Sequence, residues 1–252
     1  MKAIIFAAGL GTRLRPLTND KPKALVEVNG QTLLEITIRR LVGFGYKDII
    51  VNVHHFADKV EKCLKDNDGF GANIIISDER GQLLETGGGL KKVANFLEGD
   101  EPFLVHNVDV IHDLDLKQLY HQHQQSNALA TLAVRRRSTS RYLIFSPKMQ
   151  LRGWQNIKTG EVKLSKRSVG QLNLYAFSGI HIISPIFLDL LTEEGKFSII
   201  QPYLRLAKTE TIQGFDHSDS YWIDVGKLDS LEAAKRYLKE NPISSTNKMD
   251  FK

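Results

Sequence analysis

Residues 7–25 read AAGLGTRLRPLTNDKPKAL and directly follow the apolar run KAIIF. The run is typical of a first β-strand, and the loop behind it mixes small residues with arginine and lysine. Gly9 and Gly11 allow backbone N–H groups to approach a ligand closely, while Arg13 and Lys23 add positive charge. The prolines fix their φ angles and stiffen the loop. This combination predicts a rigid site for a polyphosphate.

Two common phosphate-binding patterns do not fit this loop. A dinucleotide-binding G-x-G-x-x-G needs a third glycine where this chain has Leu14, and the string G-x-x-x-x-G-K-[ST] does not occur. Taken singly, two glycines in a turn and one lysine on a surface are ordinary features of a βα connection. Their combination with two arginines and a proline–lysine pair in one loop favours a binding function.

The composition is that of an ordinary globular protein. The chain has 252 residues, of which 42% are hydrophobic and 25% are charged, enough for one large α/β core. Its single cysteine, Cys63, cannot form an intrachain disulfide and fits a reducing compartment. The first apolar run is too short for a membrane-spanning helix or a signal peptide. We therefore expect a soluble cytoplasmic protein.

The net charge of +5 at pH 7 suits phosphorylated ligands, nucleic acid or an anionic membrane. The densest basic cluster is Arg135, Arg136 and Arg137. No segment interleaves aromatic and basic residues as a platform for single-stranded nucleic acid would. We interpret the arginine cluster as a solvated surface and expect neither a nucleic-acid nor a membrane partner.

Strands and helices alternate in the first half of the chain, which predicts a parallel sheet with helices on both faces. The expected strands are 2–8, 48–54, 73–78 and 102–111, and the expected helices are 32–45, 57–67, 88–99 and 115–126. Ligands of such sheets bind at the carboxyl ends of the strands. From about residue 128 the strands are closely spaced, at 128–135, 141–146, 150–154, 160–165 and 172–184, before a helix at 228–241.

These patterns predict a Rossmann-like α/β fold with a mixed, mostly parallel sheet and an antiparallel elaboration. We expect a single domain over residues 1–240, divided into halves at 1–127 and 128–240. Residues 241–252 are predicted to form a polar tail.

Three further stretches extend the pattern of the opening loop. Residues 86–90 read TGGGL, residues 106–110 read HNVDV, and residues 221–231 read YWIDVGKLDSL. In this order, the four stretches resemble the signature motifs of sugar-1-phosphate nucleotidyltransferases. The resemblance covers residues 3–231, nearly the whole chain, and implies the nucleotide-diphospho-sugar transferase type of fold.

The resemblance implies a reaction in which a sugar 1-phosphate attacks the α-phosphorus of a nucleoside triphosphate and pyrophosphate leaves. The attacking phosphate is already largely ionised at neutral pH, because the second pKa of a phosphomonoester is about 6. No general base is therefore required, and the protein has to position the substrates and neutralise their charge.

The resemblance also implies a role for each candidate residue. Arg13, Lys23, Asp109 and Asp224 are expected to be catalytic. Asp109 and Asp224 are expected to bind Mg²⁺, which prefers a few carboxylates plus phosphate oxygens and water. Nucleotide contacts are expected from Ala8, Gly9, Gly11, Thr12, Arg13, Lys23, Glu85, Thr86 and Gly87. Sugar contacts are expected from Asn107, Trp154, Asn156 and Gly179.

Glu85 bears on the choice of substrate. Many relatives have glycine at this place, whereas the string L-E-T-G-G-G resembles the uridylyltransferases that act on N-acetylmuramic acid 1-phosphate in cell-wall recycling. This favours UTP and N-acetylmuramic acid 1-phosphate. The alternative is a guanylyltransferase that uses GTP with mannose or heptose 1-phosphate.

The chain departs from the family pattern in the sugar-binding region. The stretch RGWQNIKTGEVK has no Glu-Lys-Pro triplet, whose lysine contacts the sugar phosphate in many members. Arg152, Lys158 and Lys163 are the candidates to replace that lysine. The T-P of the closing motif is Lys227–Leu228 here, but Asp224 is retained.

The remaining function class is a non-catalytic sugar-nucleotide sensor on the same fold. Such a sensor would be expected to have lost a catalytic residue, but all four candidates are present. A zinc site is not expected, because the eight histidines lack a metal-ligand spacing. The sequence alone does not indicate the oligomeric state.

Overall fold

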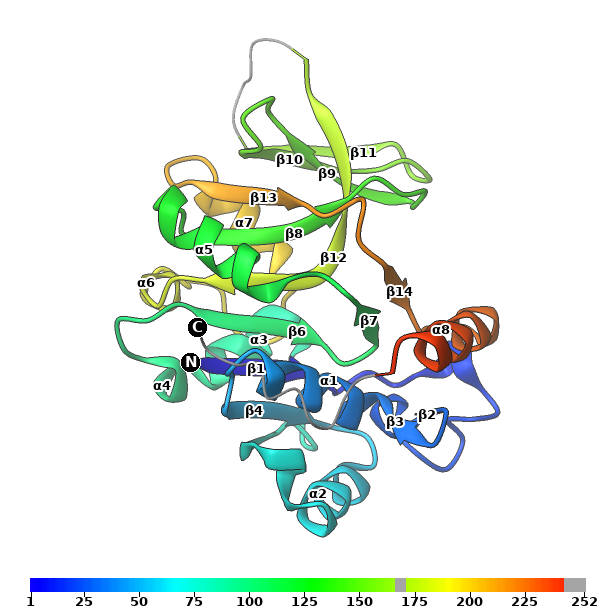
Figure 1. Cartoon of the computed structure of the whole chain (residues 1–252). Helices are drawn as coiled ribbons and strands as arrows, with labels where there is room; N and C mark the ends of the chain where they lie inside the picture. The colour runs from blue at the N-terminus through cyan, green and yellow to red at the C-terminus, as the bar shows by residue number, and fades with distance from the viewer. Residues whose placement is uncertain (166–170, 243–252) are drawn as a thin grey trace, which may run out of the picture. The chain divides into compact units, whose positions relative to one another are not determined.

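The structure is a computed structural model that describes residues 1–165 and 171–242 (Figure 1). The chain forms two compact units that alternate along the sequence. Among the described residues, unit 1 comprises Met1–Gln82, Asn107–His112 and the chain from Ile223, and unit 2 comprises Leu83–His106 and the part of the chain between Asp113 and Trp222. The predicted single domain over residues 1–240 remains a prediction, and most of the predicted tail lies outside the described residues.

Unit 1 is built on three parallel strands in the order β1-β4-β5. Its elements in chain order are β1 (Lys2–Phe6), η1 (Thr12–Leu14), η2 (Lys23–Leu25), β2 (Glu27–Val28), β3 (Gln31–Thr32), α1 (Leu33–Gly43), β4 (Asp48–Val53), α2 (Ala57–Asp66), η3 (Asp68–Gly71), β5 (Asn73–Asp78), β7 (Val110–His112) and α8 (Leu228–Glu240). Helix α8 lies beside β2, where Asn29 Nδ2 donates to Lys235 O at 2.8 Å (Figure 1).

The sequence explains why the core of unit 1 forms. Residues Ile4, Ile5, Ile50 and Val51 are at most 2% exposed, as expected for central strands that are apolar on both faces. Helix α1 begins after Thr32, whose Oγ1 accepts a hydrogen bond from Glu35 N, and its apolar side chains are buried. The alternation of strand and helix predicted for this half of the chain is confirmed.

Unit 2 contains the mixed part of the fold. Its strands follow the order β11-β10-β9-β12-β6, and β8 pairs with both β12 and β13. Strand β12 is antiparallel to β6, β8 and β9, whereas β8 and β13 are parallel. The elements are α3 (Glu85–Lys92), α4 (Ala94–Leu97), β6 (Phe103–Asn107), α5 (Leu116–Ser126), β8 (Ala130–Arg135), β9 (Arg141–Phe145), β10 (Leu151–Asn156), β11 (Glu161–Leu164), β12 (Asn173–Ile183), α6 (Ile186–Asp189), α7 (Ile200–Leu206) and β13 (Ile212–Asp216); β14 (Trp222–Asp224) leads back into unit 1. The mixed α/β fold with antiparallel additions in its second half is confirmed.

Several local predictions were wrong. The strand expected at 102–111 is two strands, β6 and β7, separated at Val108–Asp109. The helix expected at 88–99 begins earlier, at Glu85, and is interrupted at Val93. Strands β13 and β14 and helices α6 and α7 were not predicted, because their apolar patterns are short and depend on partners far away in the sequence.

The basic cluster is not a simple solvated surface. The guanidinium carbons of Arg135 and Arg137 lie 5.8 and 4.5 Å from the ring centroid of Trp222, and both side chains are partly buried. Arg136 remains exposed and lies over the ring of Tyr175. The tryptophan comes from a distant part of the sequence, so this packing was not visible in the local charge pattern.

No helix in the described part of the chain combines the length and apolar character needed to span a membrane.

Three buried histidines lead to a prediction about acid stability. Burial lowers the pKa of His123 and His217 to about 4 and that of His181 to about 3. Between pH 6.5 and 4 the unfolded chain therefore binds more protons than the native chain, and the free energy of unfolding should fall as the pH falls. Each histidine contributes up to about 1.4 kcal/mol per pH unit in this window.

Denaturant unfolding at several pH values measures this slope, and NMR titration of the histidine rings measures the native pKa values. His123→Gln should reduce the slope, whereas His121→Gln, at an exposed position of the same helix, should leave it unchanged. A His123 ring that titrates near pH 6.5 in the native protein would contradict the prediction.

Candidate functional site

The loop after β1 is fixed at its start by a buried side chain. Asn52 Oδ1, at the end of β4, accepts hydrogen bonds from Ala7 N at 2.6 Å and from Ala8 N at 3.2 Å. Asn52 is 2% exposed, and its Nδ2 donates to Glu79 Oε1 at 3.0 Å. The side-chain amide thus replaces the ladder bonds that the backbone loses where it leaves the sheet.

Buried residues anchor the middle of the loop and hold the exposed residues of the loop in place. Leu14 is fully buried and Thr18 is 4% exposed, with Thr18 Oγ1 donating to Gly11 O at 2.8 Å. Gly11 has a φ of +65°, and a Cβ there would lie 3.0 Å from Thr18 Cγ2. The conformation and the close approach both require glycine. Thr12 and Arg13 remain exposed to solvent.

Lys23 lies at the centre of the polar cluster in unit 1. It is 6% exposed, and its Nζ donates to Asp109 Oδ2 and lies 3.6 Å from Asp224 Oδ1. A buried ammonium group requires such partners, since desolvation without a counter-charge is costly. The two carboxylates expected to bind metal are therefore brought to one lysine.

Hydrogen bonds of the backbone hold the two carboxylates in place. Val108 N donates to Phe6 O of β1 at 3.1 Å, which positions the break between β6 and β7. Val225 N donates to Asp109 O at 2.8 Å, which brings the segment that carries Asp224 to the segment that carries Asp109.

Arg13 reaches the same cluster. A Cβ at Gly226 would lie 2.7 Å from Asp224 Oδ1 and 2.8 Å from Arg13 Nη2. Glycine is thus required at 226 for the guanidinium group and the carboxylate to approach each other. The structure brings together all four residues predicted to be catalytic: Arg13, Lys23, Asp109 and Asp224.

The cluster fits a divalent cation bound together with phosphate oxygens. Asp224 Oδ1 is a buried atom with no hydrogen-bond partner among the described residues, although 42% of its side chain is exposed. Such an orphaned acceptor is costly unless a ligand completes it. Within residues 1–165 and 171–242, no three or more His, Cys, Asp or Glu side chains form a metal-ligand cluster. Two carboxylates plus phosphate oxygens and water suit Mg²⁺, which takes few protein ligands.

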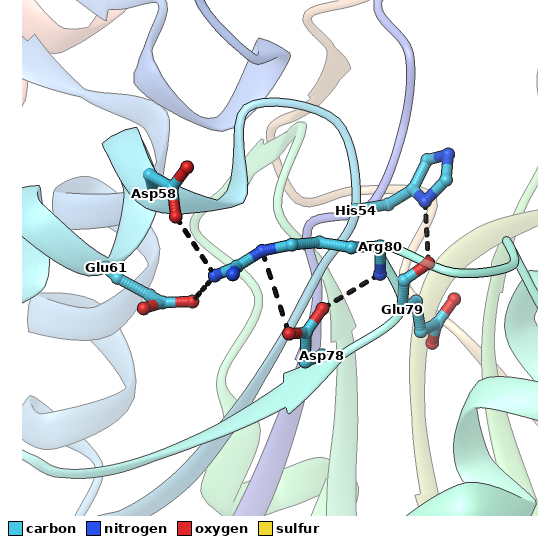
Figure 2. A network of polar contacts seen from close by, with 6 residues as sticks. All are labelled: His54, Asp58, Glu61, Asp78, Glu79 and Arg80. Carbon is cyan, nitrogen blue, oxygen red and sulfur yellow. Dashed lines mark hydrogen bonds and ion pairs between the residues drawn. The ribbon is translucent and has the colours of Figure 1, made fainter.

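A second network fixes the residues that support the loop (Figure 2). Arg80 bridges α2 and the end of β5: its Nη2 lies 3.3 Å from Asp58 Oδ1 and also contacts Glu61 Oε1, and its Nε lies 3.6 Å from Asp78 Oδ2. Between these ion pairs, Glu79 is 1% exposed and its backbone oxygen lies 2.7 Å from His54 Nδ1.

In unit 2, the TGGGL segment packs against residues 195–199. Gly87 N and Gly88 N donate to Phe197 O, at 2.9 and 3.3 Å, and Thr86 Oγ1 accepts from Ile199 N at 3.0 Å. A Cβ at Gly87 would lie 2.3 Å from the Phe197 ring. The glycine is therefore required by packing, and its contact with a nucleotide stays a prediction.

Glu85 differs from its neighbours because its side chain is exposed. Its φ is +60°, in the left-handed region that favours glycine, and its Oε1 lies 3.8 Å from Lys196 Nζ. A non-glycine residue in this conformation costs of order 1–3 kcal/mol. This backbone conformation would suit glycine better than the glutamate that this chain has.

Two of the predicted sugar-binding residues line one groove in unit 2. Trp154 and Asn156 lie on β10 and face a cavity of about 580 Å³, which α7 also lines. Lys163 lies in the same groove, with its Nζ 5.5 Å from the Trp154 ring centroid. Arg152 instead donates to Gln150 Oε1, and neither it nor Lys158 lines the groove.

Gly179 and Asn107 do not line this groove. Gly179 lies in β12 with a φ of +77°, next to Ser178, whose backbone oxygen accepts a hydrogen bond from Trp222 Nε1 at 2.9 Å. Asn107 ends β6 and belongs to unit 1, as do Ala8, Gly9 and Thr12. Their proposed ligand contacts stay predictions.

The sequence reasoning missed Asn52 and Glu79. The available signal was Asn52, a polar residue within the apolar run IIVNV, and a carboxylate directly after the next parallel strand. Both lie at the carboxyl ends of strands, where sites of α/β sheets are expected.

The arrangement in unit 1 defines a class of site: a glycine-containing loop after a first strand, a buried lysine and two carboxylates that suit a metal–polyphosphate complex. The model of the nucleotidyl transferase family matches residues 2–146. The chain is 37% identical over 247 residues to the N-acetylmuramate alpha-1-phosphate uridylyltransferase of Caulobacter vibrioides, covering 94% of this chain and 97% of that protein. It is 33% identical to the mannose-1-phosphate guanyltransferase of Yarrowia lipolytica, covering 96% of this chain and 66% of that protein.

Solved structures share the fold. HddC from Yersinia pseudotuberculosis aligns with a TM-score of 0.75 at 22% identity over 94% of this chain and 99% of that chain. UDP-glucose pyrophosphorylase from Acinetobacter baumannii aligns with a TM-score of 0.75 at 18% identity over 96% of this chain and 94% of that chain. The chain belongs to the nucleotidyl transferase family, and it is a sugar-1-phosphate nucleotidyltransferase.

The contacts of Asn52 lead to a prediction about the loop. Asn52→Ala removes the acceptor for two backbone N–H groups, which should loosen the loop and raise the KM for the nucleoside triphosphate about tenfold. The KM for the sugar 1-phosphate should change by less than about twofold, because the substitution does not touch unit 2. Steady-state kinetics with each substrate varied in turn measures both constants.

Asn73→Ala is the matched control, since Asn73 is an exposed asparagine in the same unit whose Nδ2 contacts Asp48. It should leave both constants unchanged. Equal effects of Asn52→Ala on the two KM values, or no effect on either, would refute the positioning role.

Proposed function

We propose that this protein transfers a uridylyl group from UTP to N-acetylmuramic acid 1-phosphate and releases pyrophosphate. We assign the reaction to these residues because Asp109 and Asp224 converge on buried Lys23 beside the loop. The choice of substrate is supported by two relatives named N-acetylmuramate alpha-1-phosphate uridylyltransferase, at 37% and 32% identity, each matched over 97% of its length.

The proposed chemistry needs positioning and charge neutralisation. An oxygen of the sugar 1-phosphate attacks the α-phosphorus of UTP, and the bond from that phosphorus to the oxygen bridging to the β-phosphorus breaks. The electron pair leaves with pyrophosphate. The nucleophile is already ionised at neutral pH, so no residue has to remove a proton.

Each catalytic residue then has a distinct role. Exposed Arg13 binds the oxygens of the triphosphate, and the backbone of Gly9 and Gly11 lies against it. A Cβ at Gly9 would meet no atom within 4 Å, so the backbone there is open to a ligand. Lys23 is held near the α-phosphate, where it stabilises charge that develops during transfer.

Mg²⁺ is the proposed cofactor, held by Asp109 and Asp224. A divalent cation bound there would neutralise charge on the oxygens of the reacting phosphates. Binding would also complete the coordination of Asp224 Oδ1, which lacks a hydrogen-bond partner in the described part of the chain.

In this proposal, UTP is favoured over GTP because Glu85 belongs to the string L-E-T-G-G-G, which resembles the uridylyltransferases. The backbone of Glu85 has a φ of +60°, where glycine would be unstrained, and its Oε1 lies 3.8 Å from Lys196 Nζ. We assign it, with Thr86 and Gly87, to the region that meets the nucleotide. A guanylyltransferase that uses mannose or heptose 1-phosphate is the second candidate, favoured by the mannose-1-phosphate guanyltransferases among the relatives.

The cellular setting follows from the proposed substrates. A role in cell-wall recycling and a cytoplasmic location are the finer parts of the proposal, because UTP and a recycled amino-sugar phosphate meet in that compartment. The expected partners are small molecules, with no nucleic acid and no membrane.

Pyrophosphate release, measured for four nucleoside triphosphates against several sugar 1-phosphates with and without Mg²⁺, tests the proposal. UTP with N-acetylmuramic acid 1-phosphate should give the highest kcat/KM, and activity should require Mg²⁺. A preference for GTP with mannose 1-phosphate would overturn the substrate assignment. Absence of activity across the whole matrix would favour a non-catalytic sensor.

Substitution of the carboxylates tests the metal assignment. Asp224→Asn should lower kcat by about a hundredfold or more and destabilise the fold less than Asp109→Asn does, because Oδ1 lies 3.6 Å from Lys23 Nζ without a hydrogen bond in the described structure. Asp109→Asn should lower kcat similarly and also destabilise the fold by about 2 kcal/mol, because it removes the charge nearest to buried Lys23.

Turnover measured at saturating Mg²⁺, together with thermal unfolding, separates these effects. Asp113→Asn, four positions along the chain from Asp109 and assigned to unit 2, is the control for a general loss of charge. Wild-type turnover in either cluster variant at saturating Mg²⁺ would refute the metal site.

A further inference from the structure

The groove that holds Trp154 and Asn156 carries more positive charge than the surrounding protein neutralises. It lies in unit 2, is about 580 Å³ in volume, and is lined on one side by β9, β10 and β11 and on the other by α7. Its charged lining residues are Arg141, Glu161, Lys163, Arg205 and Lys208.

Two of the four cations already have carboxylate partners. Arg205 makes a bidentate contact with Glu193, at 2.8 and 2.9 Å, which lowers the pKa of that carboxyl. Lys163 Nζ lies 3.0 Å from Glu161 Oε1. Arg141 and Lys208 make no side-chain ion pair or hydrogen bond with any residue the structure describes. The groove thus offers two cations without counter-charges.

The strand register places Arg141 close to the predicted sugar-binding residues. In the antiparallel pairing of β9 with β10, Arg141 is directly opposite Asn156, and Trp154 is opposite Leu143. Directly opposite residues have their Cβ atoms about 5 Å apart on one face of the sheet. A guanidinium group, an amide and an indole ring therefore share one face of this groove.

This combination matches a sugar that carries an anion. The half-buried indole offers an apolar surface, and the Asn156 amide can donate to a hydroxyl or carbonyl oxygen, since its Oδ1 is taken up by Lys158 N. The planar fork of Arg141 fits a carboxylate or a phosphate in a bidentate geometry.

The sugar proposed above contains both anions, a carboxylate on its lactyl ether and a phosphate at C1. Only the carboxylate distinguishes this sugar from a neutral sugar phosphate, so a cation that selects the acidic sugar has to bind that group.

We propose that Arg141 is a specificity-determining residue that binds the carboxylate of the sugar, so that the groove selects acidic amino-sugar phosphates over neutral ones. The proposal rests on the function proposed above and adds the residue that binds the carboxylate. Asn156 and Trp154 hold the ring beside it, and Lys208 adds a second positive charge.

N-acetylglucosamine 1-phosphate is the matched substrate for a test, since it has the same ring, acetamido group and 1-phosphate but lacks the lactyl carboxylate. Arg141→Gln should lower kcat/KM for N-acetylmuramic acid 1-phosphate about tenfold or more, through KM. It should leave kcat/KM for N-acetylglucosamine 1-phosphate within about twofold of wild type. Arg141→Lys keeps the charge without the fork and should give an intermediate loss.

Lys148→Gln is the control variant, because Lys148 is an exposed cation of the same unit that does not line the groove. It should change neither value. Thermal unfolding of each variant separates loss of folding from loss of recognition.

A second measurement uses a sugar without the phosphate. In NMR spectra, the indole N–H signal of Trp154 should shift when free N-acetylmuramic acid is added to the wild type and should shift much less in Arg141→Gln.

The outcomes separate this inference from the proposed function. Equal losses with both sugar phosphates would show that Arg141 binds the shared phosphate, and unchanged kinetics would show that it binds neither; each result overturns the inference. A wild-type enzyme that uses the two sugars equally well overturns it too, while the reaction class stands. A wild type inactive with every sugar 1-phosphate would instead remove the proposed function itself.

Discussion

The candidate site depends on one buried lysine. Lys23 is 6% exposed, and an ammonium group at that depth is tolerable only with negative charge close by. Asp109 and Asp224 supply the charge, and they come from segments that are distant in the sequence. The chain therefore has to return to unit 1 twice, at Asn107–His112 and again from Ile223 onward, before the lysine is neutralised.

This requirement couples folding to the formation of the site. The hydrogen bond from Val225 to Asp109 and the close approach at Gly226 bring the returning segment against Arg13 as well as Lys23. Leu14 and Thr18 of the loop are buried in internal contacts, and the backbone at the start of the loop is held by the Asn52 amide of β4. The exposed atoms of the loop remain available to a ligand, which is the pre-organisation that phosphoryl transfer requires.

Local patterns predicted much of the fold. The predicted bounds agree within about two residues for strands β1, β4 and β5 and for helices α1, α2 and α8. These bounds follow from apolar periodicity and glycine positions, which can be seen in a short stretch of sequence. The break at Val108–Asp109 was missed, since the sequence PFLVHNVDVI shows no turn signal and the break depends on contacts of Val108 with Phe6 and of Asp109 with Lys23 and Val225.

Tertiary contacts explain the other differences. The packing of Arg137 on Trp222 and of Gly87 against Phe197 joins residues that are far apart in the sequence. No local pattern records such pairs. The four catalytic candidates came from motif resemblance, and their convergence in unit 1 is what the structure adds. The polar Asn52 stands out in its apolar strand, but its contacts with Ala7 and Ala8 follow only from the pairing of β1 and β4.

The central claim is that the lysine–carboxylate cluster binds a metal ion together with a nucleoside triphosphate. Mn²⁺ binding measured by electron paramagnetic resonance, with and without a non-hydrolysable analogue of UTP, tests this claim without requiring turnover. We expect tight binding of one Mn²⁺ per chain only when the analogue is present, with loss of that binding in Asp224→Asn. Mn²⁺ affinity that is independent of the analogue, or that Asp224→Asn leaves unchanged, would contradict the account.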